Sequence, residues 1–169
     1  FSYGQRKDKM TRQIISLVDR FVDISDHTDN EAIKLIKSYS PHIAIDLNGY
    51  TKSARTQLFA ARVSPIQINF LGFPGSMGAT FMDYIISDSV VIPQEFEQYY
   101  SEKVIRLPNS FFPYDDEQYR PHKMRTEARE MDKLPQNKIV FANFNRPQKN
   151  GLEEYETWAE ILQKVRNSC

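Results

Sequence analysis

The sequence predicts an α/β fold, a Rossmann-like and mostly parallel sheet with flanking helices. Two observations predict it. Short apolar runs of strand length alternate with helix-like stretches or long loops, an order of elements that leads to parallel sheets. Residues that favour turns (Gly, Asn, Asp and Ser) recur directly after these runs. The 169 residues are enough for one ordinary domain or two small lobes.

The first 50 residues predict four elements. Apolar positions recur first at helical spacing and then with period two, so we expect a helix, a strand, a helix and a strand at residues 10–18, 20–24, 28–39 and 42–47. Thr28 and Glu31 have the spacing of a capping box, in which both side chains satisfy free backbone N–H groups at a helix start. The last of the four segments is apolar enough to predict a buried strand.

The following elements continue the same alternation. Pro65 ends a helix-like stretch over residues 54–62, and three apolar runs predict strands at residues 66–71, 84–86 and 103–107. A further apolar run predicts a strand at residues 138–144. A closing helix follows it, with Asn150 and Glu153 at the positions of its N-cap and N3 residues.

Composition divides the chain into three parts. Residues 114–137 are charged and polar without a clear period, which is typical of a linker or insertion point. We therefore expect two lobes, residues 1–113 and residues 138–169, joined by a linker at 114–137. A strand at 138–144 without sheet neighbours has exposed edges, so we expect it to pair with further strands or to mediate self-association. Because the chain lacks an initiator Met and stops straight after a helical pattern, we expect it to be a piece of a longer polypeptide.

The composition excludes several classes of function. The 22 Lys and Arg residues balance the 22 Asp and Glu residues, and a chain without net charge lacks the electrostatic surface of a dedicated nucleic-acid binder. No apolar run is long enough to span a membrane. His27, His42 and His122 are scattered and do not compose a metal site with Cys169, the single cysteine. One cysteine also excludes a disulfide framework, which favours a cytoplasmic protein.

Polar residues at the ends of predicted strands are the candidate functional residues, because open α/β sheets bind ligands at that edge. Asp46 lies near the end of a strand predicted to be buried, where a carboxylate is costly unless it is used in function or caps the following turn. Lys149 lies just before the closing helix. A cation beside the free N–H groups of a helix start suits a phosphate or pyrophosphate, although most lysines are simply exposed to solvent.

Several motifs, in order along the chain, resemble a known family. They are Asp46-Leu47-Asn48-Gly49-Tyr50-Thr51-Lys52-Ser53-Ala54-Arg55, Leu71-Gly72-Phe73-Pro74-Gly75, Met82-Asp83-Tyr84-Ile85-Ile86-Ser87-Asp88, and Phe141-Ala142-Asn143-Phe144-Asn145 with Lys149. Together they closely resemble the catalytic region of protein O-linked N-acetylglucosamine transferases and their SPINDLY relatives, glycosyltransferase family 41. The resemblance implies a GT-B architecture, with two Rossmann-like lobes facing a cleft and the nucleotide-sugar held mainly by the second lobe.

The resemblance also implies an activity. The family transfers a sugar from UDP-N-acetylglucosamine, or from GDP-fucose in one branch, to Ser or Thr hydroxyls of intracellular proteins, with inversion and without an essential metal or cofactor. Tetratricopeptide repeats usually precede the catalytic region, and none is present in these residues. The resemblance implies that residues 1–113 are a first lobe incomplete at its N-terminus and that residues 138–169 are the first strand and helix of the second lobe, so we expect residues 1–169 to be inactive by themselves. Two alternatives stay open: a related GT-B enzyme that uses another acceptor, and a non-catalytic α/β binding or assembly module.

Site residues follow from the resemblance position by position. Lys149 matches the lysine that contacts the donor diphosphate, where it would neutralise charge on the departing nucleotide. Asn145 and Arg146 would line the same pocket. Asp46 is a candidate general base. The first-lobe wall of the cleft would be formed by two segments, the turn Asn48-Gly49-Tyr50-Thr51 and the loop Gly72-Phe73-Pro74-Gly75.

Overall fold

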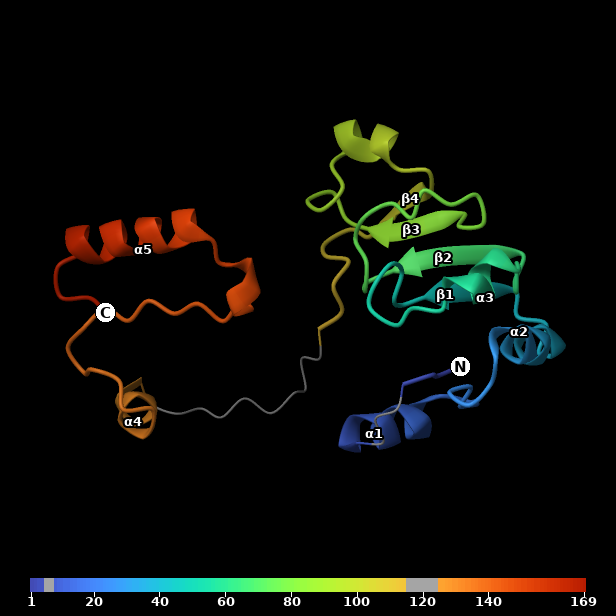
Figure 1. Ribbon diagram of the computed structural model, residues 1–169, viewed down its shortest axis with the longest axis horizontal. Helices are drawn as coiled ribbons and strands as arrows, with labels where there is room; N and C mark the ends of the chain where they lie inside the picture. Colours follow the sequence, from blue (N-terminus) through green and yellow to red (C-terminus); the bar gives the residue numbers. More distant parts are fainter. Residues whose placement is uncertain (5–7, 115–124) are drawn as a thin grey trace. The chain divides into compact units, whose positions relative to one another are not determined.

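The structure is a computed structural model that describes residues 1–4, 8–114 and 125–169 (Figure 1). The chain divides into two compact units, Phe1–Tyr114 and Asp115–Cys169. Of the linker predicted at 114–137, residues 115–124 lie outside the described residues, as does His122. The short helix α4 (Arg125–Met131) follows them.

A four-stranded parallel sheet forms the centre of the first unit (Figure 1). Its strands follow one another in space in the order of the sequence: β1 (Ile43–Asp46), β2 (Ile66–Phe70), β3 (Tyr84–Ser87) and β4 (Lys103–Arg106). Parallel neighbours need a crossover connection, and helix α3 (Thr56–Ala60) lies in the connection between the first two strands. The predicted α/β fold class is confirmed.

Two helices precede the sheet, α1 (Lys9–Leu17) and α2 (Asp29–Ser38). The predicted capping box at the start of α2 is confirmed. The Glu31 carboxylate accepts a hydrogen bond from the Thr28 N–H at 2.8 Å, and Thr28 Oγ1 accepts one from the Glu31 N–H at 3.4 Å. The hydrogen bond from the Thr28 hydroxyl is the largest cause of the lowered pKa of Glu31.

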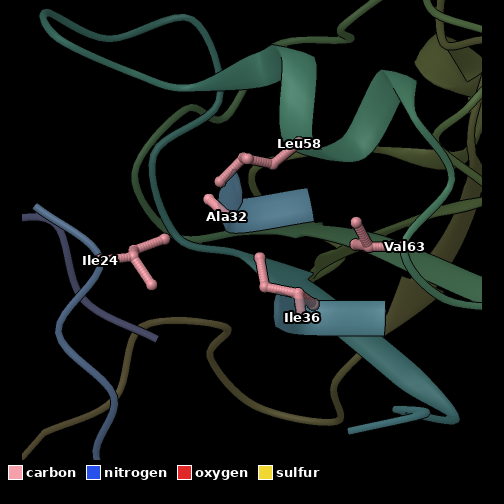
Figure 2. Packing of buried hydrophobic residues seen from close by; sticks show 5 residues of the cluster. All are labelled: Ile24, Ala32, Ile36, Leu58 and Val63. Carbon is pink, nitrogen blue, oxygen red and sulfur yellow. The ribbon is translucent and has the colours of Figure 1, made fainter. Parts of the chain in front are cut away.

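The main core of the first unit lies where α2 and α3 meet. Figure 2 shows side chains from both helices and from the flanking segments pointing toward one another. The buried members are Ile24, Ala32, Ile36, Leu58 and Val63. Burying one large aliphatic side chain stabilises a fold by about 1.5–3 kcal/mol. A second buried cluster, Met77, Ala79 and Met82, lies in the connection between β2 and β3.

Three sequence predictions about strands are wrong. Residues 20–24 form no strand, only an isolated bridge between Ser2 and Asp23. Residues 138–144 form no strand either. Among the described residues, their β-pairing is limited to one isolated bridge, between Ile139 and Ser168. The segment predicted as a buried strand is β1, which lies at an edge of the described sheet, so that Ile43 and Ile45 are 52% and 48% exposed.

The second unit is built around helix α5 (Leu152–Lys164), preceded by a short 3-10 helix, η2 (Pro147–Lys149). The N-cap of α5 is Gly151, and Glu154 at N3 accepts the Gly151 N–H at 2.7 Å, which corrects the prediction of Asn150 and Glu153. The segment before the helix runs parallel to the segment after it, since Phe141 donates its N–H to the Cys169 carbonyl at 3.0 Å. None of the described side chains of this unit is buried.

A 3-10 helix, η1 (Gln94–Tyr99), completes the described elements. None of the helices in the described ranges combines the length and the apolar character needed to cross a membrane.

Candidate functional site

A turn and a loop meet at the carboxyl edge of the sheet. One is the turn after β1, residues 48–51, and the other is the loop after β2, residues 72–75. Both strands run in the same direction, and their register pairs Asp46 at the end of β1 with Asn69 near the end of β2. The two segments that the sequence predicts as one wall of a cleft therefore start from neighbouring positions, at the edge where α/β sheets bind ligands.

The backbones of the two segments are in such close contact that two positions admit only glycine. A Cβ at Gly72 would lie 2.0 Å from the Leu47 carbonyl oxygen. Gly49 has a φ of +55°, and a Cβ there would lie 2.4 Å from Cβ of Phe73. Any side chain at either position would push the turn and the loop apart.

Aromatic side chains fix the same contact from outside. The Tyr50 and Phe73 rings pack edge to face with their centroids 5.6 Å apart. The Tyr50 hydroxyl donates to the Met77 carbonyl at 2.9 Å, and the Tyr100 hydroxyl donates to the Pro74 carbonyl at 3.2 Å. Side chains from other segments therefore hold Phe73 and Pro74 within the loop and Met77 just after it.

Asp46 is buried and holds the turn that follows it. Its Oδ1 accepts a hydrogen bond from the Asn48 N–H at 2.9 Å. Of the two roles that the sequence allows for Asp46, a functional carboxylate or a cap of the following turn, this oxygen therefore takes the second. The Asn48 side chain donates to the Tyr3 hydroxyl at 2.7 Å. The pKa of Tyr3 is raised, chiefly because burial disfavours the phenolate, and the nearby Asp46 charge raises it further. The N-terminal segment thus contributes a neutral phenol to this edge.

Arg55 anchors the N-terminal segment beside the turn. It pairs with Asp29 at 2.7 Å, and its other guanidinium nitrogens donate to the carbonyls of Ile24 and His27, both at 2.9 Å. The guanidinium carbon lies 5.8 Å from the centre of the Tyr3 ring. One cation, from the motif that carries the family resemblance, thereby ties α2 and the N-terminal segment to the site.

Sequence reasoning missed two fully buried amides in β2. Gln67 and Asn69 are both 0% exposed, and they lie two residues apart on one face of the strand. Gln67 accepts the Val63 N–H at 3.0 Å and donates to the Phe59 carbonyl at 2.9 Å. The sequence signal that could have identified them is the presence of two amides at alternate positions within an apolar strand.

A buried carboxylate, Glu102, was also missed. It lies directly before β4, and its two oxygens accept hydrogen bonds from the Met77 N–H and the Ser76 hydroxyl, each at 2.7 Å. The Ser76 hydroxyl in turn accepts the Gly78 N–H at 3.0 Å. Glu102 therefore fixes the part of the connection that follows the loop 72–75.

Asp88 orders the chain at the end of β3. Its carboxylate accepts N–H groups of Phe111 at 2.8 Å and of Val90 and Val91 at 2.9 Å each. These backbone hydrogen bonds, that from Phe111 first, lower the pKa of Asp88. Asp88 thus serves the fold at the carboxyl edge by joining the segments that follow β3 and β4.

The remaining predicted residues belong to the second unit. Asn145, Arg146 and Lys149 are exposed, and Lys149 ends η2 directly before the N-cap region of α5. The first turn of α5 carries Glu153 and Glu154, so acidic side chains already lie at this helix start. The three predicted residues share one surface segment, while Asp46 and the two loops belong to the first unit.

Across residues 1–4, 8–114 and 125–169, no group of three His, Cys, Asp or Glu side chains is arranged to hold a metal ion. The carboxyl edge offers a carboxylate, amides and hydroxyls, and the predicted site residues of the second unit include two cations, Arg146 and Lys149. The groups at the carboxyl edge can orient polar ligands and accept a proton, and the cations of the second unit can, by themselves, balance negative charge.

Comparison with known proteins identifies the family. The family model described as Glycosyl transferase family 41 matches residues 2–127. A probable UDP-N-acetylglucosamine–peptide N-acetylglucosaminyltransferase, SEC of Arabidopsis thaliana, is 37% identical over 161 residues, which is 94% of this chain and 16% of that protein. The UDP-N-acetylglucosamine–peptide N-acetylglucosaminyltransferase of Caenorhabditis elegans is 44% identical over 105 residues, which is 62% of this chain and 9% of that protein.

A solved structure supports the same relationship. An O-GlcNAc transferase of Thermobaculum terrenum, determined as a lysine-to-methionine variant, matches with a TM-score of 0.79 and 27% identity over 99% of this chain and 30% of its own. The chain thus spans under one third of that structure and 16% of the Arabidopsis relative. With a family match over residues 2–127 and the expected fold, the chain belongs to glycosyltransferase family 41.

Proposed function

We propose that this chain is part of the catalytic region of an inverting protein O-glycosyltransferase that transfers N-acetylglucosamine from UDP-N-acetylglucosamine to Ser or Thr hydroxyls. The observation that carries the proposal is the similarity, over 94% of the chain, to a relative whose name states this donor and a peptide acceptor. The glycine-only contact between the two loops at the carboxyl edge agrees with it. Such a contact gives a rigid wall where this class of sheet binds ligands.

In this proposal the first unit supplies the acceptor side of the cleft. The Asp46 carboxylate accepts the proton of the acceptor hydroxyl as that oxygen attacks the anomeric carbon of the sugar. The hydrogen bond from the Asn48 N–H fixes the orientation of the carboxylate. The turn 48–51 and the loop 72–75 position the sugar and the acceptor, because the close backbone contact keeps both segments in place.

The second unit supplies the donor side. Lys149 balances the charge that develops on the diphosphate as the bond to the sugar breaks, and Asn145 and Arg146 line the same pocket. A single displacement at the anomeric carbon forms the new glycosidic bond, releases UDP and inverts the configuration. The donor is a substrate, and the proposed chemistry uses no cofactor.

A cytoplasmic location with protein acceptors is part of the proposal. The single cysteine, Cys169, is free and exposed, which agrees with a reducing compartment. Cell fractionation with an antibody to residues 1–169 tests the location directly. Recovery in a membrane or secreted fraction would contradict this part of the proposal.

The test is a transfer assay on the natural polypeptide that carries these residues. UDP-N-acetylglucosamine and GDP-fucose are offered separately with a mixture of protein acceptors, and the products are analysed by mass spectrometry. We expect a mass gain of one N-acetylhexosamine on Ser or Thr with the first donor only. A gain from GDP-fucose instead would replace the donor, and no gain from either donor with folded protein would reject the proposal.

A further inference from the structure

Asn69 is a polar side chain in the interior of β2 whose hydrogen bonds all go to one loop. It is 0% exposed, and its neighbours in the sheet register are Asp46 on β1 and Ile85 on β3. Its Nδ2 donates to the Phe73 carbonyl at 3.0 Å and to the Gly75 carbonyl at 3.4 Å. A buried amide is costly unless it is hydrogen-bonded, so this one commits both its donors to the loop 72–75.

The other end of the same amide lies against the turn. A Cβ at Gly49 would come within 3.3 Å of Asn69 Oδ1, an oxygen without a hydrogen-bond partner among the described residues. The reverse orientation of the amide would place its oxygen against two carbonyl oxygens, which is electrostatically unfavourable. Asn69 thus hydrogen-bonds to the loop 72–75 through its Nδ2, while its Oδ1 faces the side of Gly49 where a side chain would otherwise lie.

Gln67 provides the comparison within the same strand. It is equally buried and on the same face, but its donors go to the carbonyls of Phe59 and Phe81 and its oxygen accepts the Val63 N–H. All of its partners lie outside the turn and the loop of the proposed wall. Of two matched amides, one supports the fold around the amino half of β2 and the other holds the proposed wall.

We propose that Asn69 is a positioning residue of the glycosyltransferase site. It does not touch substrate but fixes Phe73–Gly75 against the turn at Gly49, which sets the position of the wall that faces the sugar and the acceptor. The inference rests on the proposed function for its kinetic consequence and on the hydrogen bonds of Asn69 for its structural one.

The test compares Asn69→Leu with Gln67→Met in the natural polypeptide that carries these residues. Each change keeps the shape of the side chain and removes the amide. We expect Asn69→Leu to lower kcat by about 10- to 100-fold, because a displacement of about 1 Å at a reacting site has an effect of that order. KM for the nucleotide-sugar should change little, since the second lobe holds it. Gln67→Met should leave kcat close to that of the wild type at a similar loss of thermal stability.

Hydrogen–deuterium exchange supplies a second readout that does not depend on catalysis. In Asn69→Leu we expect faster amide exchange over residues 72–78, and in Gln67→Met over residues 59–65 instead. The Asn69→Ser variant keeps one donor, so it should fall between wild type and Asn69→Leu if the larger change impairs folding.

Unchanged exchange over residues 72–78 in Asn69→Leu would overturn the inference, and so would an equal loss of kcat in both variants. If the wild type transfers no sugar, the proposed function fails. The exchange comparison then decides by itself whether Asn69 holds the loop.

Discussion

Residues 43–46 and residues 138–144 have similar apolar, strand-forming sequences, yet only the first segment forms a strand. β1 pairs with β2 over four consecutive positions, from Ile43 with Ile66 to Asp46 with Asn69. The later segment has a single bridge, between Ile139 and Ser168. The comparison teaches that strand propensity becomes a strand only where a neighbour supplies a continuous ladder of hydrogen bonds.

The first and second units, to which these two segments belong, also differ in what their polar side chains do. In the first unit buried polar side chains, Gln67, Asn69 and Glu102 among them, tie loops to the sheet. In the second unit the described side chains are all at least partly exposed, including the predicted site residues around Lys149. We therefore expect substitutions in the first unit to act mainly on folding stability, and substitutions in the second unit to act mainly on catalysis.

The largest expected effect is that of Gly72→Ala in the first unit. Its new Cβ would lie 2.0 Å from the backbone oxygen of Leu47, so the two loops must separate or the sheet edge must distort. We expect the free energy of unfolding to fall by about 4 kcal/mol or more, measured by urea denaturation. Gly75→Ala is the control, since its Cβ meets only the Phe73 ring, at 3.2 Å, and a side chain can move. Equal effects of the two changes would contradict the close contact.

The next largest effect is expected from a pair of leucine substitutions, one in the core and one on the surface. Leu58→Ala removes a side chain that is 4% exposed in the core of the first unit, and we expect a loss of about 3 kcal/mol. Leu152→Ala removes one that is 73% exposed on α5, and we expect less than about 0.5 kcal/mol. Thermal unfolding of both variants measures the difference. A larger loss for Leu152→Ala would show that α5 is packed against something in solution.

Lys149→Ala tests the second unit through function. Lys149 is exposed, so we expect the melting temperature to stay within about 1 °C of the wild type while kcat of the natural polypeptide falls by about 100-fold. Lys164→Ala is the control, because it removes a cation that pairs with Glu160 on α5, away from the predicted pocket. Unchanged turnover in Lys149→Ala would remove this residue from the donor site.

The smallest expected effect is on pH dependence. The pKa of Asp88 is lowered in the fold by backbone N–H groups, so its contribution to stability is present above the unfolded-state pKa, about 3.9, and is lost as pH falls through the folded-state pKa. The melting temperature should therefore decrease less on acidification below about pH 4 in Asp88→Asn than in the wild type. Parallel acid curves for the two proteins would contradict the assignment.

Much of the fold follows from local pattern. The capping box at Thr28 and Glu31, the positions of α1, α2, α3 and α5, and the strands β2, β3 and β4 were predicted because they depend on residues close in sequence. The exposure of β1 and the absence of a strand at 138–144 were not predicted, because burial and strand pairing depend on neighbours that the local sequence pattern does not contain. The N-cap of α5 is Gly151 and not the predicted Asn150, because Gly151 adopts the extended backbone of an N-cap residue.

The site was predictable only in part. Gly49 and Gly72 stood out as turn residues, but the contacts of Gly49 with Phe73 and of Gly72 with Leu47 come from the alignment of β1 and β2. Asn69 was missed because its burial and its hydrogen bonds to the loop 72–75 depend on how that loop folds back over β2. Glu102 was missed because it lies beside β4 and binds Ser76 and Met77, which are distant from it in sequence. The roles given to Lys149 and Asp46 come from family resemblance and remain predictions.

The most direct test of the account is hydrogen–deuterium exchange of the natural polypeptide with UDP-N-acetylglucosamine and an acceptor peptide bound together. We expect slower exchange at residues 46–51 and 72–78 on the carboxyl edge of the sheet, and at residues 145–149. Residues 62–67, which lead into the amino half of β2, should not change. Unchanged exchange at residues 46–51 and 72–78, in a sample that transfers sugar, would contradict the claim that these two segments form the wall of the active site.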